Sequence, residues 1–184
     1  PGAWLTMATN QTLDLTEREK FDSNASGWWD PEGPFRPLPD LNPARLRFVK
    51  ERAELKDAQT VDVGCGGGIL AEGLASEGAN VTGIDVAPRV LATARLHLHE
   101  SGHEIDYREV TVEDLAQEFQ ESFDVLTCME MLEHDPDPAS VIAATANLLK
   151  PGGHGFNSTL NRKPLPFALG IEGARATVFV QSHV

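Results

Sequence analysis

The sequence is poor in cysteine, in basic residues and in long apolar runs. Only two of its 184 residues are cysteine, Cys65 and Cys128. Two are too few for a disulfide framework, which favours a reducing cytoplasm, and we expect both to be small buried side chains. No apolar run approaches the roughly 18 residues that a membrane-spanning helix needs. Lysine and arginine total 15 against 28 acidic residues. A chain this acidic repels phosphate backbones, so we expect no nucleic-acid partner.

Length and composition are those of an ordinary globular domain. Hydrophobic residues make up 41% of the chain and charged residues 23%, which is typical of a protein with one sizeable core. The N-terminal residues lack the basic-then-apolar layout of a secretory signal. Residues 1–6 precede Met7, and we leave them out of the fold argument. We expect an N-terminal arm over residues 1–42 and a single globular domain over residues 43–184.

The arm is rich in both aromatic residues and proline. Trp28, Trp29 and Phe35 occur in a segment with five prolines between residues 21 and 43. Flexible linkers are rarely this aromatic, so the composition indicates an ordered segment that folds back on the domain. It is either a strap over the core or a lid over a ligand site.

A helix is predicted to follow the arm. Asn42 and Pro43 are typical of an N-cap and a first helical position. Arg45 would then lie in the first turn. It could bind a carboxylate ligand, or it could be solvated.

Short β-branched segments alternate with segments of helical periodicity through the rest of the chain. This alternation predicts an α/β fold with a Rossmann-like, doubly wound, mostly parallel sheet and right-handed crossovers. Strands are predicted at residues 60–63, 80–85, 105–109, 123–128 and 154–159, and helices at residues 69–77, 88–101, 115–119 and 138–149.

The most informative stretch is TVDVGCGGG, in which a buried strand leads into a glycine-rich turn. Asp85 ends the next strand about 20 residues on, as in nucleotide-binding βαβ units. Ile69 stands where a dinucleotide signature has its third glycine, which favours a nucleoside without a pyrophosphate. S-adenosylmethionine fits this pattern. We expect the backbone amides of Gly64 and Gly66 to hold its carboxylate and Asp85 to accept hydrogen bonds from its ribose.

A second group of candidate residues follows the fourth strand in the segment EMLEH. If this segment is helical, Glu130, Glu133 and His134 share one face. Two carboxylates and an imidazole could hold Mg²⁺, which could orient and deprotonate a phenol or catechol hydroxyl. Alternatively, His134 acts as a general base without a metal. A solvated acidic loop is the third interpretation, and the spacing leaves all three open.

Together these motifs resemble those of the class I S-adenosylmethionine-dependent methyltransferases. More narrowly, they are similar to the bacterial ubiquinone-biosynthesis O-methyltransferases. The similarity extends over roughly residues 17–163. The glycine motif is common to the whole class, whereas WWD and TCMEMLEH are more specific.

The resemblance implies an enzyme that methylates phenolic hydroxyls of polyprenylated ubiquinone precursors with S-adenosylmethionine and Mg²⁺. Arg45 and Gly64 would contact the methionine end of the cofactor, Asp85 its ribose, and Met129 its fourth-strand side. We also expect a cytoplasmic location with peripheral contact with the inner membrane, through the apolar residues 165–171 or the prenyl tail. The implied metal ligands are Glu130, Glu133 and His134.

The tail after about residue 173 departs from the family. We therefore expect the C-terminal antiparallel hairpin of the class to be incomplete and the fifth strand to be left as an open edge. Two other functions remain open: a methyltransferase for another class of small molecule, and a truncated cofactor-binding protein without catalysis.

Overall fold

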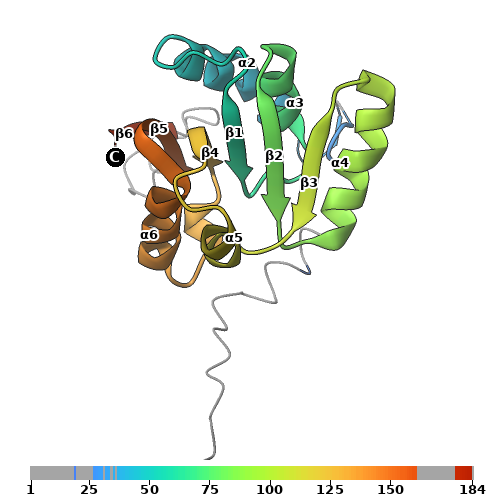
Figure 1. Cartoon of the computed structure of the whole chain (residues 1–184). Helices are drawn as coiled ribbons and strands as arrows, with labels where there is room; N and C mark the ends of the chain where they lie inside the picture. Colours follow the sequence, from blue (N-terminus) through green and yellow to red (C-terminus); the bar gives the residue numbers. More distant parts are fainter. Residues whose placement is uncertain are drawn as a thin grey trace, which may run out of the picture.

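A six-stranded sheet in the order β3-β2-β1-β4-β5-β6 forms the centre of the structure (Figure 1). The computed structural model describes residues 19, 27–30, 32, 33, 35, 37–160 and 177–183. Strands β1 to β5 pair in parallel, which confirms the Rossmann-like prediction. The strands are β1 (Gln59–Val63), β2 (Asn80–Asp85), β3 (Ile105–Glu109), β4 (Phe123–Met129), β5 (Leu149–Leu160) and β6 (Thr177–His183).

Helices cover both faces of the sheet. Apolar residues of α2, α3 and α4 form one buried cluster against it, and those of α5 and α6 form a second cluster on the opposite face. Both cysteines are free and buried in these clusters, as predicted. The helices are α2 (Pro37–Lys50), α3 (Ile69–Ser76), α4 (Pro88–Ser101), α5 (Val112–Glu118), the 3₁₀ helix η2 (Leu132–His134) and α6 (Pro138–Leu148).

Helix α2 begins earlier than predicted, at Pro37, and runs across the expected boundary at residue 42. Pro37 lies in the first turn, where a missing N–H does no harm. Pro43 is inside the helix. Asn42 therefore does not cap the helix, and its side-chain Nδ2 donates instead to the carbonyl oxygen of Ile69, 3.0 Å away. This bond ties α2 to the start of α3.

Strand β5 is not left as an open edge, so that prediction is wrong. Strand β6 pairs with it in antiparallel orientation, from His154 opposite His183 to Leu160 opposite Thr177. The backbone groups of β5 thus bond to strands on both sides.

None of the helices that the structure describes is long and apolar enough to cross a membrane. The apolar segment at residues 165–171, expected to meet a membrane or a prenyl chain, lies outside the described residues.

Candidate cofactor and acceptor site

The strand order reverses between β1 and β4. From β1 the chain proceeds to β2 and β3 on one side, and then to β4 and β5 on the other. Ligands of open parallel sheets bind at the carboxyl ends of the strands next to such a switch point. The glycine turn (residues 64–68), Asp85 and Met129 all lie at these ends. The structure thus brings the predicted cofactor residues to one edge of the sheet.

The glycine turn is held by hydrogen bonds within the protein. The amides of Gly64 and Cys65 both donate to the carbonyl oxygen of Ile84, each at 2.9 Å. The amide of Gly66 donates to Oδ2 of Asp85 at 3.0 Å. Gly64 and Gly66 have φ values of 70° and 55°, a region that L side chains rarely adopt. Both amides that we expected to bind a cofactor carboxylate are thus already used to fix the turn.

Asp85 is oriented by two backbone groups. Besides the bond from Gly66, its Oδ1 accepts a hydrogen bond from the amide of Ala87 at 2.9 Å. A carboxylate offers about four acceptor positions, so one held in this way can still accept bonds from ribose hydroxyls. The geometry is compatible with the role predicted for Asp85, which stays a prediction.

The arm packs directly on the glycine turn. We call its described part, residues 27–30 with 32, 33 and 35, the strap. Trp28 is only 8% exposed and packs in one cluster with Ile69, Ala87 and Val90. A Cβ atom added to Gly66 would lie 2.5 Å from the Trp28 ring. The turn therefore needs glycine for close packing against the strap as well as for its backbone conformation. The same segment covers part of the core and lies on the predicted ligand site, so the two interpretations of the arm do not exclude each other.

Arg45 is buried, so its solvated alternative is wrong. The residue is 4% exposed, and its guanidinium pairs with the carboxylate of Glu130 at the end of β4. Burial lowers the pKa of Arg45, and the nearby carboxylate of Asp62 opposes this effect. Ser158 on β5 donates to the other oxygen of Glu130 at 2.7 Å. The pair thus connects α2 to the carboxyl ends of β4 and β5.

A buried carboxylate lies beneath this pair. Asp62 is 2% exposed on β1, and its Oδ1 accepts a hydrogen bond of 2.6 Å from the hydroxyl of Thr127 on β4. Its Oδ2 has no hydrogen-bond partner among the described residues. Burial raises the pKa of Asp62 from 3.8 to about 7, although Thr127 and Arg45 both oppose the shift. Asp62 therefore titrates near neutral pH.

This shift makes Asp62 a source of pH-dependent stability. Because its pKa is raised on folding, its contribution is fully present below pH 4 and is lost as the pH rises through 7. We expect Asp62→Asn, which can still accept the Thr127 bond, to raise the free energy of unfolding at pH 8 by about 2–4 kcal/mol. The advantage should shrink as the pH approaches 4. Urea unfolding across this range measures it.

The control is Asp124→Asn, for which the sign is opposite. The Lys150 ammonium lowers the pKa of Asp124, so its carboxylate stabilises the fold above its usual pKa. This variant should be less stable than the parent at pH 8. A parallel loss of stability in both variants at pH 8 would contradict the role assigned to Asp62.

The three predicted metal ligands do not share a helical face. Glu130 lies outside η2 and has a φ of 54°, which is rare for a residue with a side chain. Its two carboxylate oxygens contact Arg45 and Ser158. Within the described parts of the chain, no three His, Cys, Asp or Glu residues are grouped as a metal site. This arrangement does not fit a divalent cation, because the guanidinium of Arg45 already pairs with the carboxylate of Glu130.

A groove of about 750 Å³ lies between α2, α3 and the strap, and no residue of the glycine turn lines it. It is lined by Trp29 of the strap, by residues along α2 and α3, and by His97 of α4. Its lining, as far as the structure describes it, contains none of the predicted cofactor or metal residues. It is not the acceptor site that the motifs predict.

Sequence reasoning missed Asp62, Thr127 and Ser158 as members of the site. One signal was available for Asp62, since it alternates with Val61 and Val63 and so faces away from them on β1. A charge at a buried strand position predicts a partner on a neighbouring strand. The sequence does not identify that partner, because the pairing of β1 with β4 follows from topology.

The comparisons with known proteins agree with this geometry. A family described as "Methyltransferase domain" matches residues 61–156. The ubiquinone biosynthesis O-methyltransferase of Marinobacter nauticus is 53% identical over 167 residues, which cover 90% of this chain and 70% of the relative. The enzyme of the same name from Xanthomonas euvesicatoria is 54% identical over 169 residues, which cover 92% and 71%.

Solved structures show the same fold. A magnesium protoporphyrin IX methyltransferase from Synechocystis with bound S-adenosylmethionine superposes with a TM-score of 0.69 at 21% identity, and the match covers 84% of this chain and 80% of that one. An S-adenosylmethionine-dependent methyltransferase from Mesorhizobium loti gives a TM-score of 0.54 at 30% identity, with 64% and 53% covered. The identity of 53–54% to these O-methyltransferases over about nine tenths of the chain, with the family match over residues 61–156, leads to one conclusion: the chain belongs to the ubiquinone biosynthesis O-methyltransferases of the S-adenosylmethionine-dependent class.

Proposed function

We propose that this chain transfers a methyl group from S-adenosylmethionine to a phenolic hydroxyl of a polyprenylated ubiquinone precursor. The observation that carries the proposal is the 53–54% identity to ubiquinone biosynthesis O-methyltransferases over about nine tenths of the chain. The glycine turn, Asp85 and Met129 lie at the carboxyl ends of neighbouring strands, and Arg45 of α2 pairs with Glu130 next to Met129; this arrangement supports the proposal.

The cofactor would supply an electrophilic methyl group on a sulfonium sulfur. The chain's part is to bind, to orient and to accept a proton. We assign Asp85 to the ribose, Gly64 and Arg45 to the methionine end, and Met129 to the β4 side of the cofactor. His134 ends η2, just beyond β4, and we assign it the role of accepting the phenolic proton.

Mg²⁺ is not part of this proposal. Glu130, Glu133 and His134 could bind it only if Glu130 left Arg45, and the described arrangement does not support such a site. Metal dependence is instead one outcome of the assay below.

The acceptor also determines where the chain would act. A polyprenyl chain partitions into a bilayer, because each buried CH₂ contributes about 0.8 kcal/mol. We therefore propose a cytoplasmic protein that meets its substrate at the surface of the inner membrane, with no nucleic-acid partner.

The test is an assay of the purified chain with S-adenosylmethionine and a prenylated catechol. A matched acceptor has both hydroxyls methylated beforehand. We expect methyl transfer only to the free phenol, and a loss of kcat of about 100-fold in His134→Ala but not in His99→Ala, which alters an exposed histidine of α4.

Each other result has a meaning. Transfer to an acceptor without a phenolic hydroxyl would support the other class of small molecule. Cofactor binding without turnover on any acceptor would support a binding protein. If EDTA abolishes activity, Mg²⁺ restores it and Glu133→Ala removes it, the metal assignment is correct; unchanged activity in EDTA supports His134 as a base without metal.

A further inference from the structure

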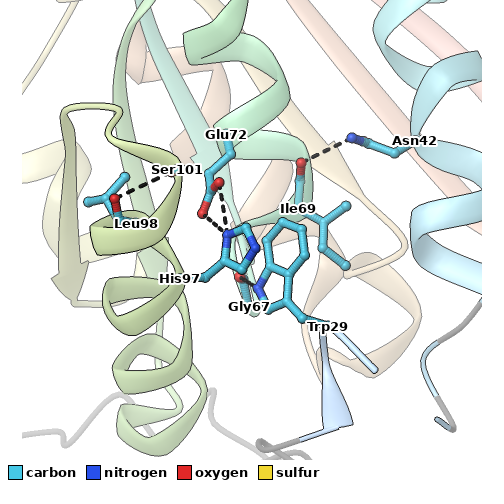
Figure 2. Close-up of polar contacts among 8 residues, drawn as sticks. All are labelled: Trp29, Asn42, Gly67, Ile69, Glu72, His97, Leu98 and Ser101. Carbon is cyan, nitrogen blue, oxygen red and sulfur yellow. Dashed lines mark hydrogen bonds and ion pairs between the residues drawn. The ribbon is translucent and has the colours of Figure 1, made fainter. Parts of the chain in front are cut away.

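A buried carboxylate on α3 begins a chain of contacts that ends on the glycine turn. Glu72 is 6% exposed in a helix that is otherwise mostly apolar. A buried carboxylate is costly unless it is paired. Both of its oxygens lie close to Nδ1 of His97 on α4, at 2.8 and 3.0 Å (Figure 2). With this partner, Nδ1 carries the proton and donates it, so Glu72 fixes both the tautomer and the orientation of the His97 ring.

The oriented imidazole supports a tryptophan of the strap. The rings of His97 and Trp29 stack with their centroids 3.4 Å apart and their planes 2° apart. Nε1 of Trp29 then donates to the carbonyl oxygen of Gly67 at 2.9 Å. Figure 2 shows Glu72 of α3 bonded to the ring of His97 of α4, and the ring of Trp29 bonded to the backbone of Gly67. We call Glu72, His97 and Trp29 the clamp.

The clamp acts on a part of the chain that has little stiffness of its own. Three consecutive glycines, residues 66–68, have no side chains to hold the turn. On one side the Gly66 amide bonds to Asp85. On the other side Trp28 packs against Gly67, where an added Cβ would lie 2.7 Å from the Cβ of Trp28. The hydrogen bond from Trp29 thus fixes the carbonyl between the Asp85 contact and the start of α3.

We propose that the clamp positions the glycine turn for S-adenosylmethionine, so that Glu72, His97 and Trp29 set cofactor affinity as positioning residues. The proposal rests on the cofactor site at this turn. A strap that only covers the core would also bury Trp28. It would not need a stacked imidazole, a buried carboxylate partner and a hydrogen bond to Gly67.

The test measures cofactor binding in variants that break the clamp at different points. Trp29→Ala removes the stack and the bond to Gly67, and it leaves the Glu72–His97 pair in place. We expect its Kd for S-adenosylhomocysteine to rise about tenfold in isothermal titration. Trp29→Phe, which keeps a ring for stacking and loses the donor, should lie between the parent and Trp29→Ala. His99→Ala, on an exposed position of the same helix, should bind like the parent.

A double variant tests whether the contacts form one chain. His97→Ala should also weaken binding, and Trp29→Ala with His97→Ala should bind no worse than Trp29→Ala alone, because each variant breaks the same path. Independent, multiplying effects would overturn the proposal. So would a Kd for Trp29→Ala within twofold of the parent, in a protein whose melting temperature shows that it is folded.

A steady-state measurement separates positioning from general destabilisation. The KM for S-adenosylmethionine should rise in Trp29→Ala with kcat and the acceptor KM nearly unchanged. The measurement of Kd needs no acceptor. It therefore decides the role of the clamp even if the parent chain binds the cofactor and methylates no phenol. That last result would overturn only the proposed function.

Discussion

Gly66→Ala is expected to destabilise the protein and to weaken cofactor binding together. The alanine would have to adopt the φ of 55° that Gly66 has. Its Cβ would lie 2.5 to 3.0 Å from three atoms of the Trp28 ring. The left-handed backbone conformation costs an alanine about 1–2 kcal/mol, and the close contact with Trp28 costs about 1–3 kcal/mol more. We therefore expect the free energy of unfolding in urea to fall by about 3 kcal/mol. The Kd for S-adenosylhomocysteine should rise more than about tenfold, because the Gly66 amide would leave Asp85.

Gly102→Ala is the matched control. Gly102 has a φ of 71°, and an added Cβ would meet nothing within 4 Å. We therefore expect the free energy of unfolding of this variant to fall by about 1–2 kcal/mol, the cost of the left-handed backbone alone, with no effect on cofactor binding. Equal losses of stability in the two variants would show that the contact with Trp28 does not restrict the turn.

Asp85→Asn is expected to give the largest loss of cofactor affinity. In the parent, the two carboxylate oxygens accept hydrogen bonds from the amides of Gly66 and Ala87. The amide side chain has one oxygen, so its NH₂ group must face one of these N–H donors or turn away. It also loses the charge that strengthens bonds to ribose hydroxyls. Two such bonds, each contributing about 1.5 kcal/mol, predict a Kd for S-adenosylhomocysteine about 100-fold higher.

Asp106→Asn tests whether any lost carboxylate would have this effect. Asp106 lies on the neighbouring strand β3, is 54% exposed and pairs with Arg108. Exposed pairs contribute little, so both the Kd and the stability should stay close to those of the parent. Similar binding by the two variants would remove Asp85 from the cofactor site.

The sheet and its order of elements were predictable because they depend on local patterns. Strands β2 and β3 and helix α4 have the predicted bounds. Helix α5 begins three residues before the predicted start, at Val112. Thr111 caps it by accepting a hydrogen bond from the amide of Asp114. The pattern of Thr followed three residues later by an acidic residue was a signal of this start.

The polar interior of the site was not predictable from local patterns. The Arg45–Glu130 pair joins residues 85 positions apart, and the Glu72–His97 pair joins residues 25 positions apart on different helices. Such pairs depend on which elements become neighbours. The shared face of Glu130, Glu133 and His134 depended on a helix that began at Glu130, but Glu130 has a positive φ and the 3₁₀ turn begins only at Leu132. Side-chain spacing alone could not reveal this.

The hydrogen bond between Asp62 and Thr127 also has a consequence for assembly of the sheet. The two residues lie opposite each other on β1 and β4 and are 65 positions apart. At about 5–20 residues per second, β1 is synthesised about 3–13 seconds before β4. When β4 docks, a slip of one residue would turn the Thr127 hydroxyl to the opposite face and leave an unpaired carboxylate in the core. The bond therefore favours the native register of the two central strands over a register shifted by one residue. The native register places Met129 level with the glycine turn.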